Sequence, residues 1–337
     1  MRVAIASAAL GALFIIPAAT AAAADPTPQT GRTVVVKRVS GTVMVQPRGS
    51  KRLTRLDAAR ALPVGSVVDT TSGRVKLTST ADRGGSKLQS AVFREGAFKV
   101  TQRKANRPLT ELELVGGDFE NCGASVHRTG VFASANRSRR RLWGSGKGRF
   151  RTRGRNGTAT VRGTTWLTED DCAGTTAFNR NGKVEAESTD LAYTLDPGQS
   201  VIFTCNTQGI QDVVGLYCLA VLSQPADNIF GFGIAAQTPD DSYELCIAEP
   251  DGTLNCGPFP FGPPENGIRA AGVGCLPAQV GTHTVYWRLR GTDLPVPLPF
   301  QSTRASEQSF CISEPRRPGI DPPARLAPKL RAAARGS

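Results

Sequence analysis

The sequence predicts an all-β protein, because short alternating runs and frequent turn formers fill the chain while long amphipathic patterns are lacking. Of 337 residues, 36 are Gly and 23 are Pro, which supply many turns. Between these turns, short runs alternate apolar with polar side chains. Residues 53–62 form the one segment that fits a helical turn or two. In the first part of the chain we expect strands within Val34–Val45, Val64–Asp69, Arg74–Thr78, Ala91–Phe93, Ala97–Val100 and Leu109–Leu114.

The N-terminus has the pattern of a secretory signal peptide. A basic start, Met1-Arg2, precedes the apolar run Val3–Ile16, and Ala22 and Ala24 occupy positions −3 and −1 of a cleavage site. We expect a signal peptide over residues 1–24 that is cleaved after Ala24; a retained membrane anchor is the alternative. No later stretch approaches the roughly 18 apolar residues of a membrane span. We therefore expect a secreted, extracytoplasmic protein with no transmembrane segment in the mature chain.

All eight cysteines lie beyond the predicted signal peptide, and an even number in an exported chain favours disulfides. Cys246 and Cys256 bracket the turn sequence 250–252, Pro-Asp-Gly, which predicts a hairpin with the two cysteines opposite each other. Cys122 and Cys172 are the only cysteines in the front part of the chain. We therefore predict the disulfides Cys246–Cys256 and Cys122–Cys172, and the remaining pairings stay open.

Charge divides the chain into three parts. Residues 25–165 carry 28 Lys and Arg against 9 Asp and Glu, a net charge of +19. Residues 166–315 carry 6 against 18, a net charge of −12, and residues 316–337 carry 6 against 1, a net charge of +5. The front of the chain therefore raises the local concentration of any polyanion nearby.

The densest basic run predicts a surface that attracts polyanions, which we name the basic face. For an exported chain we expect an anionic wall or surface polymer, or a protein partner, and we do not expect genomic DNA. The alternative is a strand face whose charges only keep the protein in solution. The predicted basic face consists of Arg137, Arg139, Arg140, Arg141, Lys147, Arg149, Arg151 and Arg153.

A segment near the middle of the chain resembles the central motif of FecR-type domains, in which a small-residue strand runs into Val-Arg-Gly-Thr and an aromatic. It covers residues 157–169 and reads GTATVRGTTWLTE. Residues 174–186 are similar to the family's next hairpin, and residues 195–201 resemble its closing strand. The resemblance extends over residues 31–205 and implies a FecR-like β-domain there. Its motif residues are Val161, Arg162, Gly163, Thr164 and Trp166.

This resemblance implies a fold and a compartment more than an activity. The best-known FecR-type proteins relay a signal from an outer-membrane siderophore receptor to a sigma factor, through a membrane helix and a cytoplasmic segment. This chain has a predicted signal peptide in that place, so we do not expect direct sigma-factor regulation. Independently of the family, Gly163 would permit a backbone twist or a close approach, and Trp166 offers a large buried anchor.

After residue 205 the composition changes, because the chain becomes acidic. Strand-like runs at the spacing of a seven-stranded sandwich predict an immunoglobulin-like or fibronectin-like β-sandwich over residues 206–314. The tail, residues 315–337, is rich in Pro and basic residues and poor in apolar ones, which predicts disorder. In the sandwich we expect strands at Tyr217–Val221, Ile229–Ile234, Tyr243–Ile247, Gly281–Leu289 and Leu294–Phe300.

Few side chains suggest catalysis or metal binding. His127 and His283 lack companions at ligand spacing, so we expect a surface or packing role for each. Residues 143–148, WGSGKG, lack the spacing of a phosphate-binding loop and the hydroxyl that should follow Lys147, and a flexible hairpin is expected. The acidic cluster 169–171 lacks the calcium-loop pattern and predicts a solvated turn.

These observations favour binding over catalysis. We expect no catalytic residues, no metal and no cofactor. The leading hypothesis is a non-catalytic exported binding or scaffold protein that contacts anionic cell-wall or surface polymers or a protein partner. The alternative is an extracellular sensor subunit that relays a signal to a membrane partner. A hydrolase is the least supported class, because no nucleophile–base pair or metal constellation can be assembled from the sequence.

Overall fold

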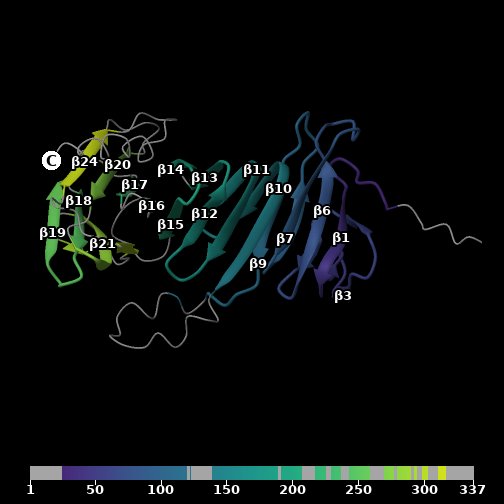
Figure 1. The fold of residues 1–337 in the computed structure, drawn as a ribbon, viewed down its shortest axis with the longest axis horizontal. Coiled ribbons are helices and arrows are strands. Elements are labelled where there is room, and N and C mark those ends of the chain that lie inside the picture. The colour runs from purple at the N-terminus through teal and green to yellow at the C-terminus, as the bar shows by residue number, and fades with distance from the viewer. Residues whose placement is uncertain are drawn as a thin grey trace, which may run out of the picture.

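The computed structural model shows an all-β protein, as the sequence predicts, and every element in its described residues is a strand (Figure 1). The predicted signal peptide lies outside these residues, as does the predicted tail apart from Pro315. The described residues are 25–119, 122, 139–188, 191–206, 217–224, 229–236, 243–258, 269–276, 279–289, 292–293, 298–302 and 310–315.

The strands of the described residues have the following bounds. The first group is β1 (Thr33–Gly41), β2 (Met44–Gln46), β3 (Thr54–Arg55), β4 (Arg60–Pro63), β5 (Val67–Asp69), β6 (Gly73–Thr80), β7 (Leu88–Arg94), β8 (Ala97–Gln102) and β9 (Thr110–Val115). The second is β10 (Arg140–Arg153), β11 (Thr158–Asp170), β12 (Thr175–Asn181), β13 (Val184–Ser188), β14 (Leu191–Leu195) and β15 (Ser200–Asn206). The third is β16 (Tyr217–Gln224), β17 (Ile229–Ala236), β18 (Tyr243–Ala248), β19 (Leu254–Pro258), β20 (Arg269–Leu276), β21 (Gly281–Leu289), β22 (Thr292–Asp293), β23 (Leu298–Ser302) and β24 (Phe310–Pro315).

The segment 53–62, which fits a helical turn, is extended instead. It contributes β3 and part of β4, and these strands pair with β2 and β1 respectively. Leu56 and Leu62 are completely or almost completely buried in the core cluster from these extended stretches. Strand pairing and burial therefore override a weak local helical preference.

The hairpin of β10 and β11 organises the sheet, because β10 changes its other partner halfway along. Residues Trp143–Lys147 pair antiparallel with β7, whereas Phe150–Arg153 pair parallel with β9. The register against β11 shifts between Lys147 and Phe150, as expected for a β-bulge. At Gly148, β10 therefore passes from one arm of the sheet to the other, and we name this point the corner of β10.

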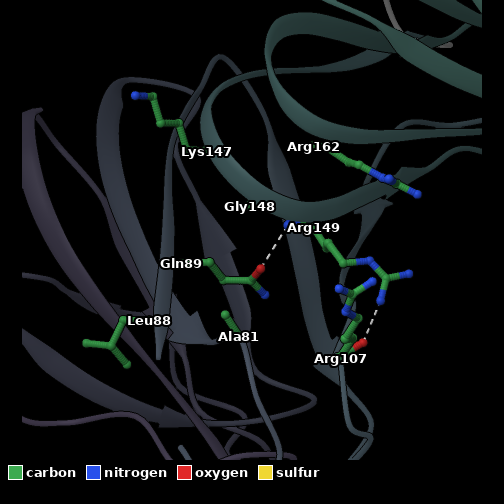
Figure 2. A pocket seen from close by; sticks show the side chains of 8 residues that line it. All are labelled: Ala81, Leu88, Gln89, Arg107, Lys147, Gly148, Arg149 and Arg162. Carbon is green, nitrogen blue, oxygen red and sulfur yellow. Dashed lines mark hydrogen bonds between the residues drawn. The ribbon is translucent and has the colours of Figure 1, made fainter. Parts of the chain in front are cut away.

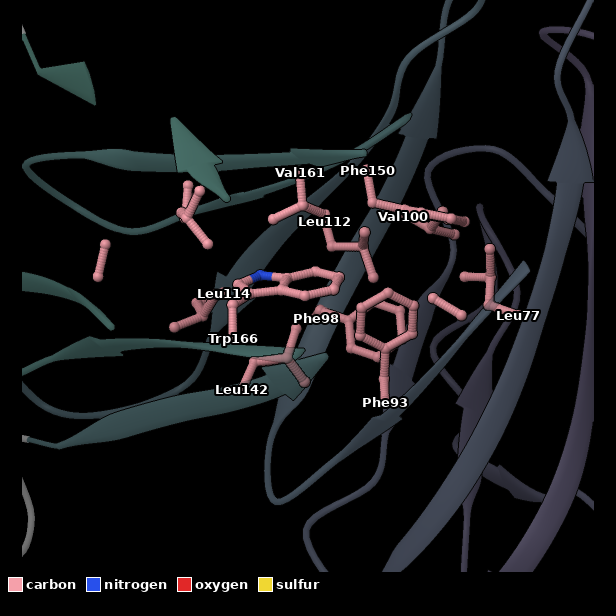
Figure 3. Packing of buried hydrophobic residues seen from close by; sticks show 14 of the residues in the cluster. Leu77, Phe93, Phe98, Val100, Leu112, Leu114, Leu142, Phe150, Val161 and Trp166 are labelled. Carbon is pink, nitrogen blue, oxygen red and sulfur yellow. The ribbon is translucent and has the colours of Figure 1, made fainter. Parts of the chain in front are cut away.

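Two arms extend from this corner. One runs through β7, β6, β1 and β4, and the other through β9, β8, β5, β2 and β3. Both arms contribute side chains to one buried cluster, in which Phe93 of the first arm packs 5.4 Å from Phe98 of the second, centroid to centroid (Figure 3). Burial of this apolar surface stabilises the corner between them.

Trp166 occupies the centre of this cluster, as the sequence predicts for a large anchor. It is completely buried, its ring lies edge-on 5.9 Å from that of Phe93, and its indole N–H donates to Thr152 Oγ1 at 3.0 Å (Figure 3). Gly144 lies directly against this ring, because a Cβ there would come within 2.4 Å of it. The expectation of a close approach at Gly163 is wrong, since nothing lies within 4 Å of the Cβ that it lacks.

The hairpin expected within residues 174–186 does not form. β12 pairs with the end of β11 and with β15, while β13 pairs with the start of β11 and with β14. β11 therefore changes its strand partner along its length, as β10 does. β12 and β13 are consecutive in the chain but pair with different parts of β11 and not with each other.

Strand pairing continues across the predicted domain boundary. β15 pairs with β12 on one side and β16 on the other, and β17, β20 and β24 extend the same sheet. A second sheet contains β19, β18 and β21, with β22 and β23 paired to β21 (Figure 1). The strands expected here are found in part or in full, while the immunoglobulin-like assignment and the domain boundary stay predictions.

Both predicted cysteine pairs are at bonding distance. Cys122 and Cys172 join the stretch after β9 to the turn after β11, with Cα atoms 5.1 Å apart. Cys246 on β18 lies directly opposite Cys256 on β19, with Cα atoms 4.0 Å apart. Each bond restricts the unfolded chain and so favours the folded state.

Candidate functional site

The predicted basic face divides into cations with a carboxylate partner and cations without one. Arg137 lies outside the described residues. Lys147 and Arg149 make no ion pair within the described part of the chain. The other five are paired: Arg139 with Glu169 at 2.7 Å, Arg140 with Asp170 at 2.8 Å, Arg141 with Glu95 at 3.1 Å, Arg151 with Glu187 at 3.4 Å and Arg153 with Glu111 at 3.1 Å.

Lys147 and Arg149 line a cavity of about 550 Å³ at the corner of β10, which we name the corner pocket (Figure 2). Arg107, from the loop between β8 and β9, and Arg162 of β11 line it as well. The Arg107 and Arg149 side chains approach each other and Arg162 extends on the same side, whereas Lys147 points away beyond Gly148 (Figure 2). The other lining residues are Ala81, Leu88, Gln89 and Gly148.

Gln89 holds the backbone of the pocket at Arg149 in place from inside the protein. Its side-chain carbonyl accepts the N–H of Arg149 at 2.8 Å, and its amide nitrogen lies 3.1 Å from both the Thr80 carbonyl oxygen and Thr110 Oγ1. The residue is only 5% exposed, so these hydrogen bonds replace the water that its amide would otherwise bind. Because its polar atoms are engaged inside the protein, Gln89 supports the site and leaves ligand contacts to the cations.

Gly148 allows the strand to approach this glutamine. Its φ is +131°, a conformation that residues with a Cβ rarely adopt. A Cβ there would also lie 2.6 Å from that of Gln89. Directly after it, the Arg149 guanidinium donates to the Arg107 carbonyl oxygen at 2.7 Å, which holds two of the pocket cations together (Figure 2).

The corner pocket carries positive charge that nearby acids do not neutralise. Among the described residues, no carboxylate lies within ion-pair distance of its four cations. Asp82, next in sequence to the lining residue Ala81, is engaged in its own loop by the Lys87 N–H at 2.9 Å and the Ser86 hydroxyl at 2.7 Å. The hydrogen bond from the Lys87 backbone is the main cause of its lowered pKa.

This arrangement is suited to binding an anion. Guanidinium groups donate paired N–H bonds to carboxylate, phosphate or sulfate groups. The volume lies within the range of roughly 300–1,000 Å³ of small-ligand sites, so an anionic group and part of the molecule that carries it can enter. Arg107, Lys147 and Arg162 are exposed, which leaves their donors accessible from solvent.

His283 has the packing role that the sequence predicts, with a partner that sequence spacing did not reveal. It is completely buried, its Nε2 lies 2.7 Å from Glu249 Oε2, and its Nδ1 lies 3.1 Å from the Gly281 carbonyl oxygen. His127 lies outside the described residues. Within the described residues, no three His, Cys, Asp or Glu side chains gather as metal ligands would.

The solvated turn that we expected at the acidic cluster 169–171 is found only at Asp171, which is partly exposed and accepts the N–H of Ala173 in the turn after β11. Glu169 and Asp170 end β11, and Asp170 is completely buried. Its carboxylate accepts hydrogen bonds from the Arg155 N–H at 3.0 Å and the Thr175 hydroxyl at 2.5 Å, besides its ion pair with Arg140. These donors offset the cost of burying the charge, so the cluster belongs to the structure of the hairpin.

The flexible hairpin expected at residues 143–148 is also wrong. These residues lie inside β10, and Trp143–Lys147 pair with strands on both sides. The pocket residues Gln89 and Arg107 were missed because they are remote from the basic run in sequence. The one local signal was Gly148, flanked by Lys147 and Arg149.

The fold and the pocket together define an all-β protein with a candidate anion-binding site. Comparison of the chain with protein-family models, curated proteins and solved structures found no match. The resemblance to FecR-type domains therefore stays a prediction from the motif around Trp166. The described residues contain no helix that is long enough and apolar enough to cross a membrane.

Proposed function

We propose that the protein is a non-catalytic exported binding protein that holds an anionic cell-wall or surface polymer through the corner pocket. The observation that carries this proposal is the set of four cations that line one cavity without a described carboxylate partner. Five neighbouring cations of the basic face do have such partners. The contrast favours a site that takes its counter-charge from outside the protein.

The chemistry of the pocket favours binding over catalysis. Arginine stays protonated at physiological pH and therefore cannot accept a proton from a substrate. The amide of Gln89 is engaged in internal hydrogen bonds. The lining supplies charge and donors, which position an anion, and it supplies no nucleophile–base pair.

The cysteines support the extracytoplasmic part of the proposal. Two pairs, Cys122–Cys172 and Cys246–Cys256, lie at disulfide distance, and such bonds persist in oxidising compartments. The predicted signal peptide over residues 1–24 points the same way. An exported protein with a net charge of +19 over residues 25–165 meets anionic surface polymers before it meets nucleic acid.

The test is retention of the mature chain on isolated wall material under a salt gradient. We expect the variant Arg107→Ala/Arg162→Ala to elute at lower salt than the wild type, because two pocket cations are lost. A control with the same charge change, Lys51→Ala/Arg52→Ala, alters two exposed residues between β2 and β3 and should elute like the wild type. Equal elution of the two variants, or retention that salt does not weaken, would contradict the proposal.

A further inference from the structure

A second surface lies on the outward side of the same sheet. The strand register places Arg94 opposite both Arg74 and Trp143, Trp143 opposite Leu167, and Leu167 opposite Phe178. These residues form one row across β6, β7, β10, β11 and β12, and none of them is buried. We name them the arginine–aromatic row.

Aromatic and cationic groups contact each other along this row. The ring of Trp143 meets that of Phe178 edge-on, with centroids 6.1 Å apart. The guanidinium carbon of Arg94 lies 5.0 Å from the centroid of the Trp143 ring, within the distance of a cation–π contact. A partly exposed aromatic pair of this kind offers an apolar surface for the C–H face of a ring, beside donors for an anionic substituent.

The row is also crowded with positive charge. Glu95 pairs with Arg94 and with Arg141, the latter at 3.1 Å, while Arg74 and Arg180 have no ion pair within the described residues. The pKa of Arg94 is lowered by partial burial and then by the charges of Arg74, Arg180 and Arg141. Four guanidinium groups, those of Arg74, Arg94, Arg141 and Arg180, therefore lie near one another with a single carboxylate, Glu95, paired to two of them. An anion from outside would reduce the repulsion between these positive charges.

The backbone at Glu95 is held in an uncommon conformation. In the described residues it is the one non-glycine residue with positive φ, at 65°. Such a conformation is uncommon for a residue other than Gly, Asn or Asp and persists where surrounding structure holds it. Here the next residue leaves no freedom, because a Cβ on Gly96 would overlap the Arg141 carbonyl oxygen.

The row and the corner pocket share one strand face. Trp143 and Lys147 both have side chains on the outward side of β10, and four residues of strand separate them by about 13 Å. A linear polymer could therefore contact both, whereas a single small anion could not. A ligand that contacts both sites would therefore carry rings as well as charges.

We propose that the arginine–aromatic row binds the sugar rings and carboxylates of an acidic polysaccharide whose chain continues into the corner pocket. The C–H face of a pyranose would pack on the aromatic pair, and its carboxylate would accept N–H bonds from Arg94 and Arg180. This inference rests on the proposed function and deepens it, because it selects a carboxylated glycan over a polymer of phosphate alone.

The test compares two polyanions by calorimetry on the full mature chain: an oligogalacturonate, which has rings and carboxylates, and a linear polyphosphate of similar charge, which has no rings. We expect Trp143→Ala to weaken oligogalacturonate binding about tenfold and to leave polyphosphate binding within about twofold. Arg180→Ala, at an exposed position, should weaken oligogalacturonate binding without affecting folding. Trp143→Phe should restore most of the loss, because an aromatic ring is kept.

The outcomes separate this inference from the proposed function. If the wild type binds polyphosphate through Arg107 and Arg162 but Trp143→Ala and Arg180→Ala leave oligogalacturonate binding unchanged, the row is not a glycan site and the pocket proposal stands. Equal weakening of both polyanions by Trp143→Ala would also overturn the ring-stacking proposal. If the wild type binds neither polyanion, both proposals fail.

Discussion

The side-chain carbonyl of Gln89 accepts the backbone N–H of Arg149 at 2.8 Å, which ties β7 to β10 at the point where β10 changes its partner from β7 to β9. This hydrogen bond joins the core network around Thr80 and Thr110 to the opening of the corner pocket. The stability of the corner and the arrangement of the pocket cations therefore depend on one buried amide.

Replacing this amide by an apolar side chain tests that dependence. We expect Gln89→Leu to lower the free energy of unfolding by about 1–3 kcal/mol, because the Arg149 N–H and the Thr80 carbonyl lose a buried partner. Urea unfolding measures this change. Gln46→Leu is the matched control, since within the described residues the Gln46 amide donates to one partner, the partly exposed Ser50 carbonyl, at 2.8 Å. An effect at Gln89 no larger than at Gln46 would contradict this account of the corner.

Replacing the two tryptophans on the β10–β11 hairpin, one at a time, should lower the free energy of unfolding by very different amounts. Trp166 is completely buried and donates to Thr152, so we expect Trp166→Ala to cost about 3–5 kcal/mol. Trp143 is only half-buried on the outward face, and Trp143→Ala should cost much less. Denaturant midpoints of the two variants, at equal slope, give the comparison. A larger loss for the Trp143 variant would show that the core is misassigned.

Four further cysteines should form two cross-strand disulfides. The register places Cys205 opposite Cys218 and Cys275 opposite Cys311, in the same antiparallel relation as the bonded pair Cys246 and Cys256. Directly opposed strand residues have Cβ atoms within about 4.5–5.5 Å, near the range that a disulfide requires. Mass spectrometry of a non-reduced digest of the protein should recover both linked peptides. Free thiols at these positions, or linkage of Cys205 to Cys275, would contradict the register.

Two carboxylates, on Asp82 and Asp251, should make the free energy of unfolding depend on pH. Backbone N–H groups of Lys87 and Thr253 are the main cause of the lowered pKa values of Asp82 and Asp251, whose ordinary value is 3.8. A lowered pKa in the folded state means that the unfolded chain takes up protons first. The contribution of each group is therefore present above pH 3.8 and lost as pH falls through the folded-state pKa.

Asp82→Asn isolates one of these carboxylates. The difference in unfolding free energy between wild type and variant should be constant well above pH 3.8, where the carboxylate is ionised in both the folded and the unfolded state. It should shrink as pH falls below 3.8. Denaturant unfolding at a series of acidic pH values measures it. A difference that grows on acidification would reverse the assigned sign.

The sequence predicted the strands well because alternation reports directly which side chains are buried. Trp166 and the pair Cys246–Cys256 could be placed for similarly local reasons, namely size and a turn sequence. The corner of β10 could not be predicted, since residues 147 to 153 carry a Lys or Arg at every second position straight through the bulge. The periodic pattern therefore carries no sign of the change in strand partner.

The candidate site was predicted only in part, because a charge count does not show which charges are paired. The sequence placed Lys147 and Arg149 in one group with five cations that have carboxylate partners in the structure, such as Glu169 and Asp170. These acids lie far along the chain and meet the arginines through strand register. Arg107 and Gln89 enter the pocket through long-range pairing of β7 and β9 with β10, which no local motif specifies.

The most direct test of the central claim is the salt dependence of polyphosphate binding by the full-length protein. The slope of log Kd against log salt concentration counts the cations that the polymer contacts, at roughly one per cation. We predict that Arg107→Ala/Arg162→Ala lowers this slope by about two and weakens binding, whereas Lys51→Ala/Arg52→Ala leaves both unchanged. The same slope for wild type and the pocket variant would show that the corner pocket does not hold the polyanion.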